Sequence, residues 1–141
     1  MLRYETATSA PPEVVWPLLA RPDRWHEWAW HVRGAWGLGS PEVRAGALGA
    51  VRLLGVAPVP VRIVDVDPGR SWSWRAGPLL FVHRVDPVVA GGSVVGIDVD
   101  GPAPVLALVR RTYGPWCRHV TRVMAERAAA DASSAASRGG W

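Results

Sequence analysis

The spacing of hydrophobic residues changes twice along the chain, and each change predicts a different kind of secondary structure. Residues 2–9 alternate between apolar and polar side chains and contain β-formers, which predicts a strand. Apolar residues then recur at helical spacing, with Val14, Val15, Leu18 and Leu19 on one face. A series of short runs with period two follows, and the last long segment returns to helical spacing.

The first predicted helix begins and ends at prolines. Pro11 and Pro12 suit a first helical turn, because the N–H that proline lacks would have no partner there. Glu13 favours the positive end of the helix dipole. The segment Arg21-Pro22-Asp23 ends this helix, and we expect Asp23 to cap a second short helix over residues 24–28.

Short runs with period two, separated by glycine and proline, fill the middle of the chain. Pro68-Gly69, Gly77-Pro78 and Gly91-Gly92 are typical of hairpin turns. Together with the first strand, these runs predict a meandering antiparallel sheet of seven strands. The runs are Val32–Leu38, Leu48–Leu54, Val59–Val66, Ser71–Ala76, Leu79–Asp86 and Ser93–Asp100.

A long helix is expected after the sheet, ending at about Ala130. Gly114-Pro115 should kink or briefly break it. Residues 131–141 are small and polar and predict a flexible tail, which leaves residues 1–130 as one domain. The apolar stripe of the helix contains Leu106, Val109, Tyr113, Trp116 or Cys117, Val120, and Val123 or Met124.

The order strand, two short helices, six strands and long helix predicts an α+β fold. A curved antiparallel sheet must bury one face, and only the C-terminal helix is long enough to cover it. A curved sheet and one helix enclose more volume than side chains readily fill. We therefore expect a ligand pocket between them, of the class with volumes of about 300–1,000 Å³.

The chain contains nine tryptophans beside one phenylalanine and two tyrosines. Each indole brings roughly 150–250 Å² of surface and one N–H that needs a partner. A chain of 141 residues has few places to bury so many rings. Either the core is unusually aromatic, or some of the rings line a cavity that a flat apolar ligand fills.

Charge gives little reason to expect a nucleic-acid or membrane partner. The net charge is +4, but the arginines are spread along the chain, with only Arg110 and Arg111 adjacent, and a nucleic-acid-binding face would cluster them. The longest apolar runs, such as Val105–Val109, are too short to span a bilayer. The first residues lack the apolar stretch of a signal peptide, so a cytoplasmic protein is expected.

No metal site is expected. The single cysteine, Cys117, excludes an internal disulfide and a cysteine-based zinc site, and we expect it to pack as a small hydrophobe. His26, Glu27 and His31 lie close in sequence, but their spacing differs from that of helical histidine pairs that bind zinc. Solvated surface is the favoured interpretation of these three residues.

The alternation of side chains indicates which residues face the pocket. In the run Leu79–Asp86 the even positions include Arg84 and Asp86, so the odd positions, among them His83, should point inward. The same reasoning applied to the neighbouring strands and the helix gives a set of residues expected to contact a ligand. They are Trp72, Trp74, Phe81, Val61, Ile63, Val95, Ile97, Val109 and Trp116.

Three side chains are candidates for catalysis. His83 offers an acid or base with an unperturbed pKa of about 6.5. Tyr113, on the covering helix, could donate a hydrogen bond to a carbonyl or enolate oxygen. Asp65 could orient the histidine or act as a base. Such a set suits aldol-type cyclisation and dehydration, in which enolisation needs a base and the carbonyl needs a donor.

A purely structural interpretation competes with this one. In it, Trp72 and Trp74 belong to the core, His83 makes a structural hydrogen bond, and Asp65 lies in a polar network near a turn. For a lone inward histidine the structural role is favoured. For the tryptophans the structural and functional interpretations are about equally favoured, because in this fold the wall of the pocket and the core are the same surface.

The sequence resembles the START/Bet v 1-like superfamily (SRPBCC), and within it the polyketide cyclase/dehydrase-like proteins. The resemblance covers roughly residues 2–128. It is carried by Ala10–Trp16, Trp25–Trp28, Val64–Trp74, His83–Val85 and Gly91-Gly92. It implies the helix-grip fold, a seven-stranded curved antiparallel sheet wrapped around a long C-terminal helix. The family has no invariant catalytic residue, so no role is transferred from it to these residues.

The leading hypothesis for function is binding of a small hydrophobic molecule, with cofactor-free cyclisation or dehydration of an aromatic or polyketide-like substrate in secondary metabolism. A non-catalytic carrier or sensor of a lipid or secondary metabolite is the alternative, and a protein-interaction module is a third. Whether the protein is an enzyme stays open. We expect no metal or organic cofactor, no nucleic acid, no membrane insertion, and a monomer or a homodimer.

Overall fold

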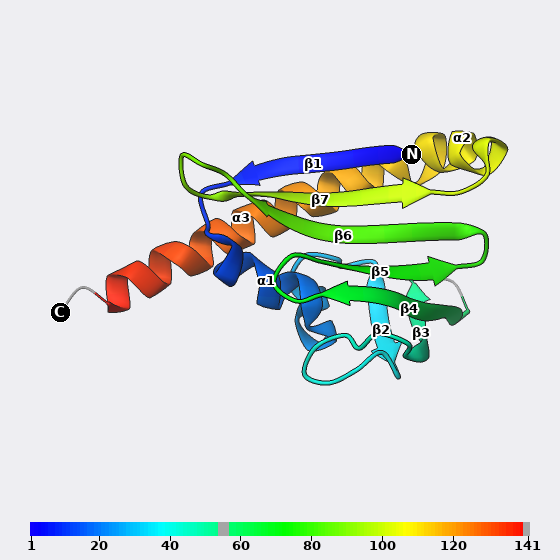
Figure 1. The fold of residues 1–141 in the computed structure, drawn as a ribbon, viewed down its shortest axis with the longest axis horizontal. Helices are drawn as coiled ribbons and strands as arrows, with labels where there is room; N and C mark the ends of the chain where they lie inside the picture. The colour runs from blue at the N-terminus through cyan, green and yellow to red at the C-terminus, as the bar shows by residue number, and fades with distance from the viewer. Residues whose placement is uncertain (54–56, 140–141) are drawn as a thin grey trace.

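A computed structural model describes residues 1–53 and 57–139 (Figure 1). Leu54, the last residue of one expected strand, and the final two residues of the expected tail lie outside the described residues. The elements are β1 (Leu2–Thr8), α1 (Pro12–Ala20), the 3₁₀ helix η1 (Pro22–Glu27), β2 (Val32–Trp36), β3 (Leu48–Leu53), β4 (Val59–Asp67), β5 (Ser71–Ala76), β6 (Leu79–Pro87), β7 (Ser93–Asp100), α2 (Ala103–Thr112) and α3 (Gly114–Arg138).

The strands form one antiparallel sheet in the order β1-β7-β6-β5-β4-β3-β2, and α3 crosses one face of it (Figure 1). The predicted α+β architecture is therefore confirmed. Glycine is needed where the turn between β6 and β7 meets β1. Gly92 has φ +83°, and a Cβ there would lie 2.4 Å from the carbonyl oxygen of Thr8.

Tryptophan side chains cap the end of α1. Pro22 prevents the helix from continuing, which leaves the carbonyls of its last turn without helical partners. The indole N–H of Trp28 donates to the carbonyl oxygen of Leu18 at 2.8 Å, and those of Trp25 and Trp72 donate to Leu19 at 3.0 and 2.9 Å. The tryptophans thus join α1, η1 and β5 into one core.

The second short helix differs from its prediction. It is a 3₁₀ helix that begins at Pro22, and no side chain caps it. Asp23, the expected cap, instead accepts two hydrogen bonds from the guanidinium of Arg21. The proline already fixes the start of the helix, so a side-chain cap is not required.

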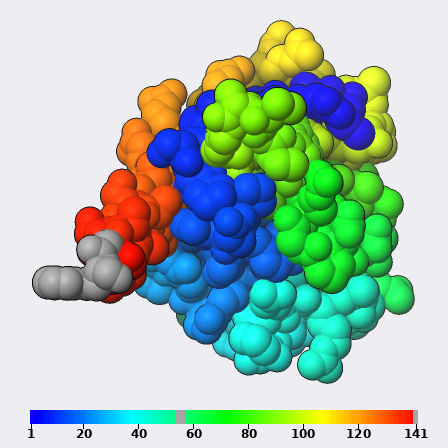
Figure 2. Space-filling view, turned by 60° about the vertical axis from the view of Figure 1, so that its left-hand side comes forward, coloured from blue at the N-terminus to red at the C-terminus, as the bar shows by residue number. Residues whose placement is uncertain are grey.

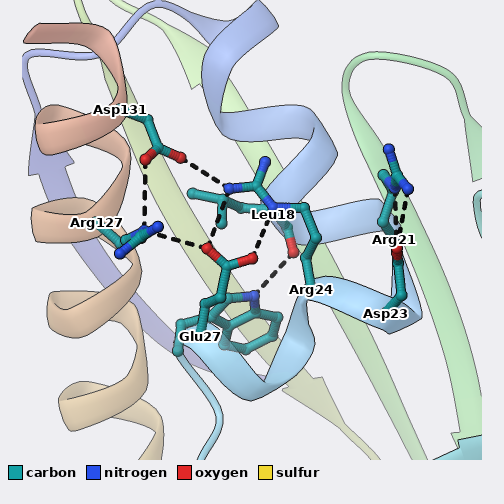
Figure 3. Close-up of polar contacts among 8 residues, drawn as sticks. Leu18, Arg21, Asp23, Arg24, Glu27, Arg127 and Asp131 are labelled. Carbon is teal, nitrogen blue, oxygen red and sulfur yellow. Dashed lines mark hydrogen bonds and ion pairs between the residues drawn. The ribbon is translucent and has the colours of Figure 1, made fainter. Parts of the chain in front are cut away.

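An ion-pair network fastens η1 to α3 (Figure 3). Arg24 donates to both carboxylate oxygens of Glu27, at 2.8 and 3.2 Å, and to Asp131 at 2.8 Å. Arg127 approaches Glu27 at 3.1 Å and Asp131 at 3.4 Å. The Arg24 guanidinium holds the pKa of Glu27 below its usual range, so this carboxylate stays ionised at neutral pH.

The predicted break in the C-terminal helix is present, but the helix ends later than expected. Tyr113 separates α2 from α3, and Gly114 begins α3. A side chain at Gly114 would collide with the hydroxyl of Tyr4, so glycine allows α3 to start against β1.

At its other end, α3 continues to Arg138 instead of ending at about Ala130. The boundary expected at residue 130 is therefore not marked by a change in secondary structure. Packing ends close to it nonetheless. Ala128 is buried and Ala132 half-buried, whereas residues 133–138 are exposed. The last turns of α3 extend beyond the body of the molecule (Figure 2).

A β-bulge corrects one expected side-chain direction. On β4, Val61 and Ile63 are buried as predicted, but the pairing with β5 shifts between Ile63 and Asp65. The extra residue turns Val64 and Asp65 outward together, and Val66 takes the inward position. Asp65 is therefore exposed, although strict alternation would have pointed it into the core.

Candidate functional site

A cavity of about 260 Å³ lies between the inner face of the sheet and the helices. Strands β2 to β7 form one wall, and η1, the segment that follows it, α2, Tyr113 and α3 form the other. Most of the lining is aromatic or aliphatic. Of the residues expected to contact a ligand, six line the cavity: Trp72, Trp74, Phe81, Val61, Ile97 and Val109.

The other three expected ligand contacts lie elsewhere. Ile63 and Val95 point inward as predicted, but both are fully buried core residues outside the cavity lining. Trp116 is 37% exposed and lies on the outer side of α3, against Trp30. Of the two alternatives in the predicted stripe, Cys117 is the buried one, in line with Val109, Val120 and Met124.

His83 faces inward from β6 and lines the cavity, as predicted. Its ring lies parallel to the indole of Trp72, and Trp74 meets it edge-on. Burial lowers the pKa of His83 to about 3, and contacts with the Trp72 backbone and the charge of Asp98 oppose this shift only weakly. The imidazole is therefore neutral at physiological pH.

Tyr113 also lines the cavity, but its polar partner is not one of the residues expected. Its hydroxyl is 3.0 Å from Nε2 of His31, a residue for which solvated surface was the favoured interpretation. Burial raises the pKa of the Tyr113 phenol and lowers that of His31, so both groups are neutral at pH 7. Either group can donate in this neutral pair, because the role of Nε2 depends on the tautomer of the imidazole.

The sequence signal for His31 was weak. It follows η1 just before β2, where neither helical nor strand periodicity assigns a face. Its neighbour Trp30 is exposed and Ala29 is buried. The position of His31 is set by the way this short segment packs against the α2–α3 junction. Asp65, in contrast, is exposed on the far side of the sheet and does not meet His83.

Three buried polar atoms find no hydrogen-bond partner among the described residues, and all three belong to side chains that line the cavity. They are Nδ1 of His31, Nε1 of Trp74 and Nδ1 of His83. Buried polar groups are nearly always satisfied in folded proteins, so each exception needs an explanation, such as a partner that binds there. The unsatisfied capacity for hydrogen bonding therefore collects around this cavity.

The remaining reactive groups of the described residues do not form a second site. Across residues 1–53 and 57–139, no group of His, Cys, Asp or Glu side chains is arranged to hold a metal ion. Cys117 is buried, and burial raises its pKa to about 12, so the thiol stays protonated. None of the helices in the described part of the chain has the length and apolar character needed to cross a membrane.

Comparison with known proteins agrees with this geometry. The sequence profile described as "Polyketide cyclase / dehydrase and lipid transport" matches residues 2–137, nearly the whole chain. No curated protein matches the sequence.

Several solved structures share the fold at low sequence identity. A solution structure from Thermobifida fusca is 19% identical with a TM-score of 0.71, and the match covers 90% of this chain and 91% of the other. DynU16, described as a putative protein of the dynemicin biosynthetic locus, is 18% identical with a TM-score of 0.65, and the match covers 87% of this chain but only 45% of DynU16. Ara h 8.0201 is 12% identical with a TM-score of 0.65, with 90% and 95% of the two chains covered.

Proposed function

Since the chain belongs to the polyketide cyclase/dehydrase and lipid transport family, we propose that its cavity binds a small, flat and uncharged hydrophobic molecule of aromatic or polyketide-like character. The composition of the cavity carries this proposal. No Asp, Glu or Arg contributes to its described lining, and its titratable side chains are His31, His83 and Tyr113. A charged ligand group would lose its hydration there without gaining a counter-charge.

The shape of the wall supports a planar ligand. The indoles of Trp25 and Trp72 are stacked with centroids 5.3 Å apart, and Trp74 stands edge-on to both. Aromatic rings favour offset-stacked and edge-to-face contacts, which a flat ligand can extend. The volume of about 260 Å³ limits the ligand to a few fused rings or a short chain.

The Tyr113–His31 pair supplies polar recognition. A ligand carbonyl can accept the phenolic hydrogen in place of His31, and a ligand hydroxyl can donate to Nε2 of His31. The proposed ligand therefore carries at least one neutral oxygen on a largely apolar body.

Binding is tested by native mass spectrometry of the purified protein and by fluorescence titration with acetylnaphthalene, naphthol and naphthoate. We expect the ketone and the phenol to bind at least about tenfold more tightly than the carboxylate at neutral pH. Val61→Phe, which fills the cavity, should abolish binding. Val64→Phe is the matched control, because it adds the same ring to the outer face of the same strand. Equal binding to both variants would place the ligand outside the cavity.

Cofactor-free cyclisation with dehydration is the second candidate function, and the position of the Tyr113–His31 pair in the cavity favours it. In such a reaction His31 takes a proton from an α-carbon, and this carbon forms a carbon–carbon bond to a carbonyl carbon. Tyr113 gives its phenolic proton to the carbonyl oxygen, and His31 returns the proton to Tyr113. A second α-hydrogen then leaves together with the new hydroxyl as water, and a carbon–carbon double bond remains.

His83 is the weaker base of the two histidines. An imidazole whose conjugate acid has a pKa of about 3 takes a proton from carbon poorly. For His83 we therefore propose contact with the substrate through its neutral ring. Turnover assays with a poly-β-ketone mimic test whether Tyr113 and His31 act in catalysis or in binding alone. Tyr113→Phe and His31→Phe should each abolish turnover, whereas Tyr113→Phe should weaken binding only modestly. Full turnover in both variants would exclude the Tyr113–His31 pair from catalysis, and no turnover by the unmodified protein would leave binding without catalysis as the function.

A further inference from the structure

A row of aromatic rings connects the surface of the protein to the cavity. Trp30 and Trp116 meet with centroids 4.8 Å apart, and Trp116 is 5.8 Å from His31. His31 in turn is 5.9 Å from Tyr113, which is 6.1 Å from Phe81 on the cavity wall. Each ring thus touches the next from solvent to the interior.

The two outermost rings are exposed although they are large and apolar. Trp30 is 42% exposed and Trp116 is 37% exposed. Trp30 lies between η1 and β2, and Trp116 lies in the first turn of α3, so the pair bridges two elements distant in sequence. Exposed aromatic pairs of this kind are common at binding surfaces, because the free faces can take up a further ring.

Only one layer of side chains separates this pair from the cavity. His31 and Tyr113 line the cavity on one side, and His31 contacts both tryptophans on the other. The hydrogen bond between His31 Nε2 and the Tyr113 hydroxyl closes this layer at 3.0 Å. Nδ1 of His31 has no partner among the described residues, so the imidazole is held by this one hydrogen bond.

The backbone on the helical side is fixed. Gly114 packs against Tyr4 so closely that a Cβ could not be accommodated, and Cys117 is buried in the next turn. Opening of this wall therefore falls to the side chains of His31 and Tyr113, which can separate at the cost of one hydrogen bond.

We infer that Trp30 and Trp116 form an outer binding site for the flat hydrophobic ligand, from which it enters the cavity by displacing the His31–Tyr113 pair. This inference rests on the proposed function. The continuity of the ring contacts into the cavity supports it. A competing route into the cavity would pass between the ends of strands β3 to β6. The half-buried lining residues there are Leu53, Val59, Ala76 and Leu79.

Stopped-flow binding of the neutral fluorophore N-phenyl-naphthylamine separates the two routes. Trp30→Leu, Trp116→Leu and the double variant should lower the association rate constant by about threefold to tenfold, because the encounter site is lost. Trp36→Leu is the matched control, since Trp36 is 50% exposed on β2 and outside the row. Tyr113→Phe should instead raise both the association and the dissociation rate constants, because the closing hydrogen bond is absent.

The outcomes distinguish this inference from the proposed function. Normal affinity with unchanged association rates in the double variant, or slowing equal to that of Trp36→Leu, would overturn the outer site. Absence of any binding to the unmodified protein would contradict the proposed function itself, and the outer site with it. Far-ultraviolet circular dichroism and melting temperature establish that each variant is folded.

Discussion

The imidazole of His83 lies flat on the indole of Trp72, with ring centroids 3.9 Å apart and an angle of 9° between the planes. The two residues are directly opposite each other on β5 and β6, so the sheet register itself brings the rings into contact. The stack covers the imidazole and removes it from water. A polar side chain is thereby converted into a neutral part of an aromatic wall.

The free energy of unfolding should decrease as the pH is lowered, because the imidazole of His83 is buried. The pKa of His83 is about 3 in the folded protein and about 6.5 when unfolded. The unfolded chain therefore binds a proton in a pH range where the folded protein does not. The stabilisation is complete above about pH 6.5 and is lost as pH falls toward 3, with a slope of at most about 1.4 kcal/mol per pH unit.

Urea denaturation at about pH 7 and about pH 5 checks this expectation. His83→Phe should reduce the dependence on pH over this interval, and the part that remains belongs to His31, whose pKa burial also lowers. His119→Gln, on the surface of α3, is the matched control. The NMR resonances of the His83 ring should not titrate over the same interval. Titration near the ordinary pKa would contradict the burial argument.

Arg84 should be a major contributor to stability on the outer face of the sheet. It makes two hydrogen bonds to the carboxylate of Asp98, at 2.8 and 3.0 Å, and the two side chains are only 13% and 6% exposed. Arg84→Met leaves a buried carboxylate without its counter-charge, and we expect a loss of about 2–4 kcal/mol in the free energy of unfolding. Chemical denaturation measures it.

Two further variants identify the cause. Arg84→Met combined with Asp98→Leu should recover most of the loss, because the pair is then replaced by apolar side chains. Arg21→Met breaks an ion pair whose side chains are 40% and 62% exposed, and it should leave stability unchanged within error. A double variant as unstable as Arg84→Met alone would show that packing, not charge, is responsible.

Local signals were sufficient to predict most of the fold. Period-two runs and glycine–proline breaks gave Ser71–Ala76 and Ser93–Asp100 with the observed bounds, and the pocket-facing side of β6 followed from its charged positions. The bulge before Asp65 was missed because strict alternation was extended through the whole of β4. Apolar and polar positions exchange after Ile63, where Asp65 takes an odd position and Val66 an even one, and the side chains after the bulge reverse accordingly.

The candidate site was predictable where it lies on regular strands and less so elsewhere. Trp72, Trp74, Phe81 and His83 line the cavity as alternation requires. His31 was missed because a segment between two elements has no period from which a face can be inferred. Its role depends on a contact with Tyr113 across 82 positions of sequence, which only the packing of the whole domain creates.

The end of α3 should be dispensable up to a defined residue. Asp131 belongs to the network with Arg24 and Arg127, whereas residues 133–138 are exposed. A chain ending at Ala132 should keep its melting temperature, and a chain ending at Ala130 should lose about 0.5–1 kcal/mol with the ion pairs of Asp131. Asp131→Asn in the full chain should reproduce that loss. Equal stability of the two shortened chains would show that the ion pairs of Asp131 contribute nothing measurable.

Trp72 and Trp74 should respond differently to the same substitution. Nε1 of Trp72 donates to the carbonyl oxygen of Leu19 at 2.9 Å, whereas Nε1 of Trp74 is buried without a partner among the described residues. Replacement by phenylalanine removes the same atoms from both rings. At position 72 it also breaks a hydrogen bond, whereas at position 74 it removes a buried donor that has no partner. Trp72→Phe should therefore cost about 1–2 kcal/mol more than Trp74→Phe in urea denaturation of the ligand-free protein.

Saturation with acetylnaphthalene, whose carbonyl can accept a hydrogen bond from Trp74, should narrow this difference between the two variants. Equal costs without ligand would mean that the indole N–H of Trp74 is satisfied in solution.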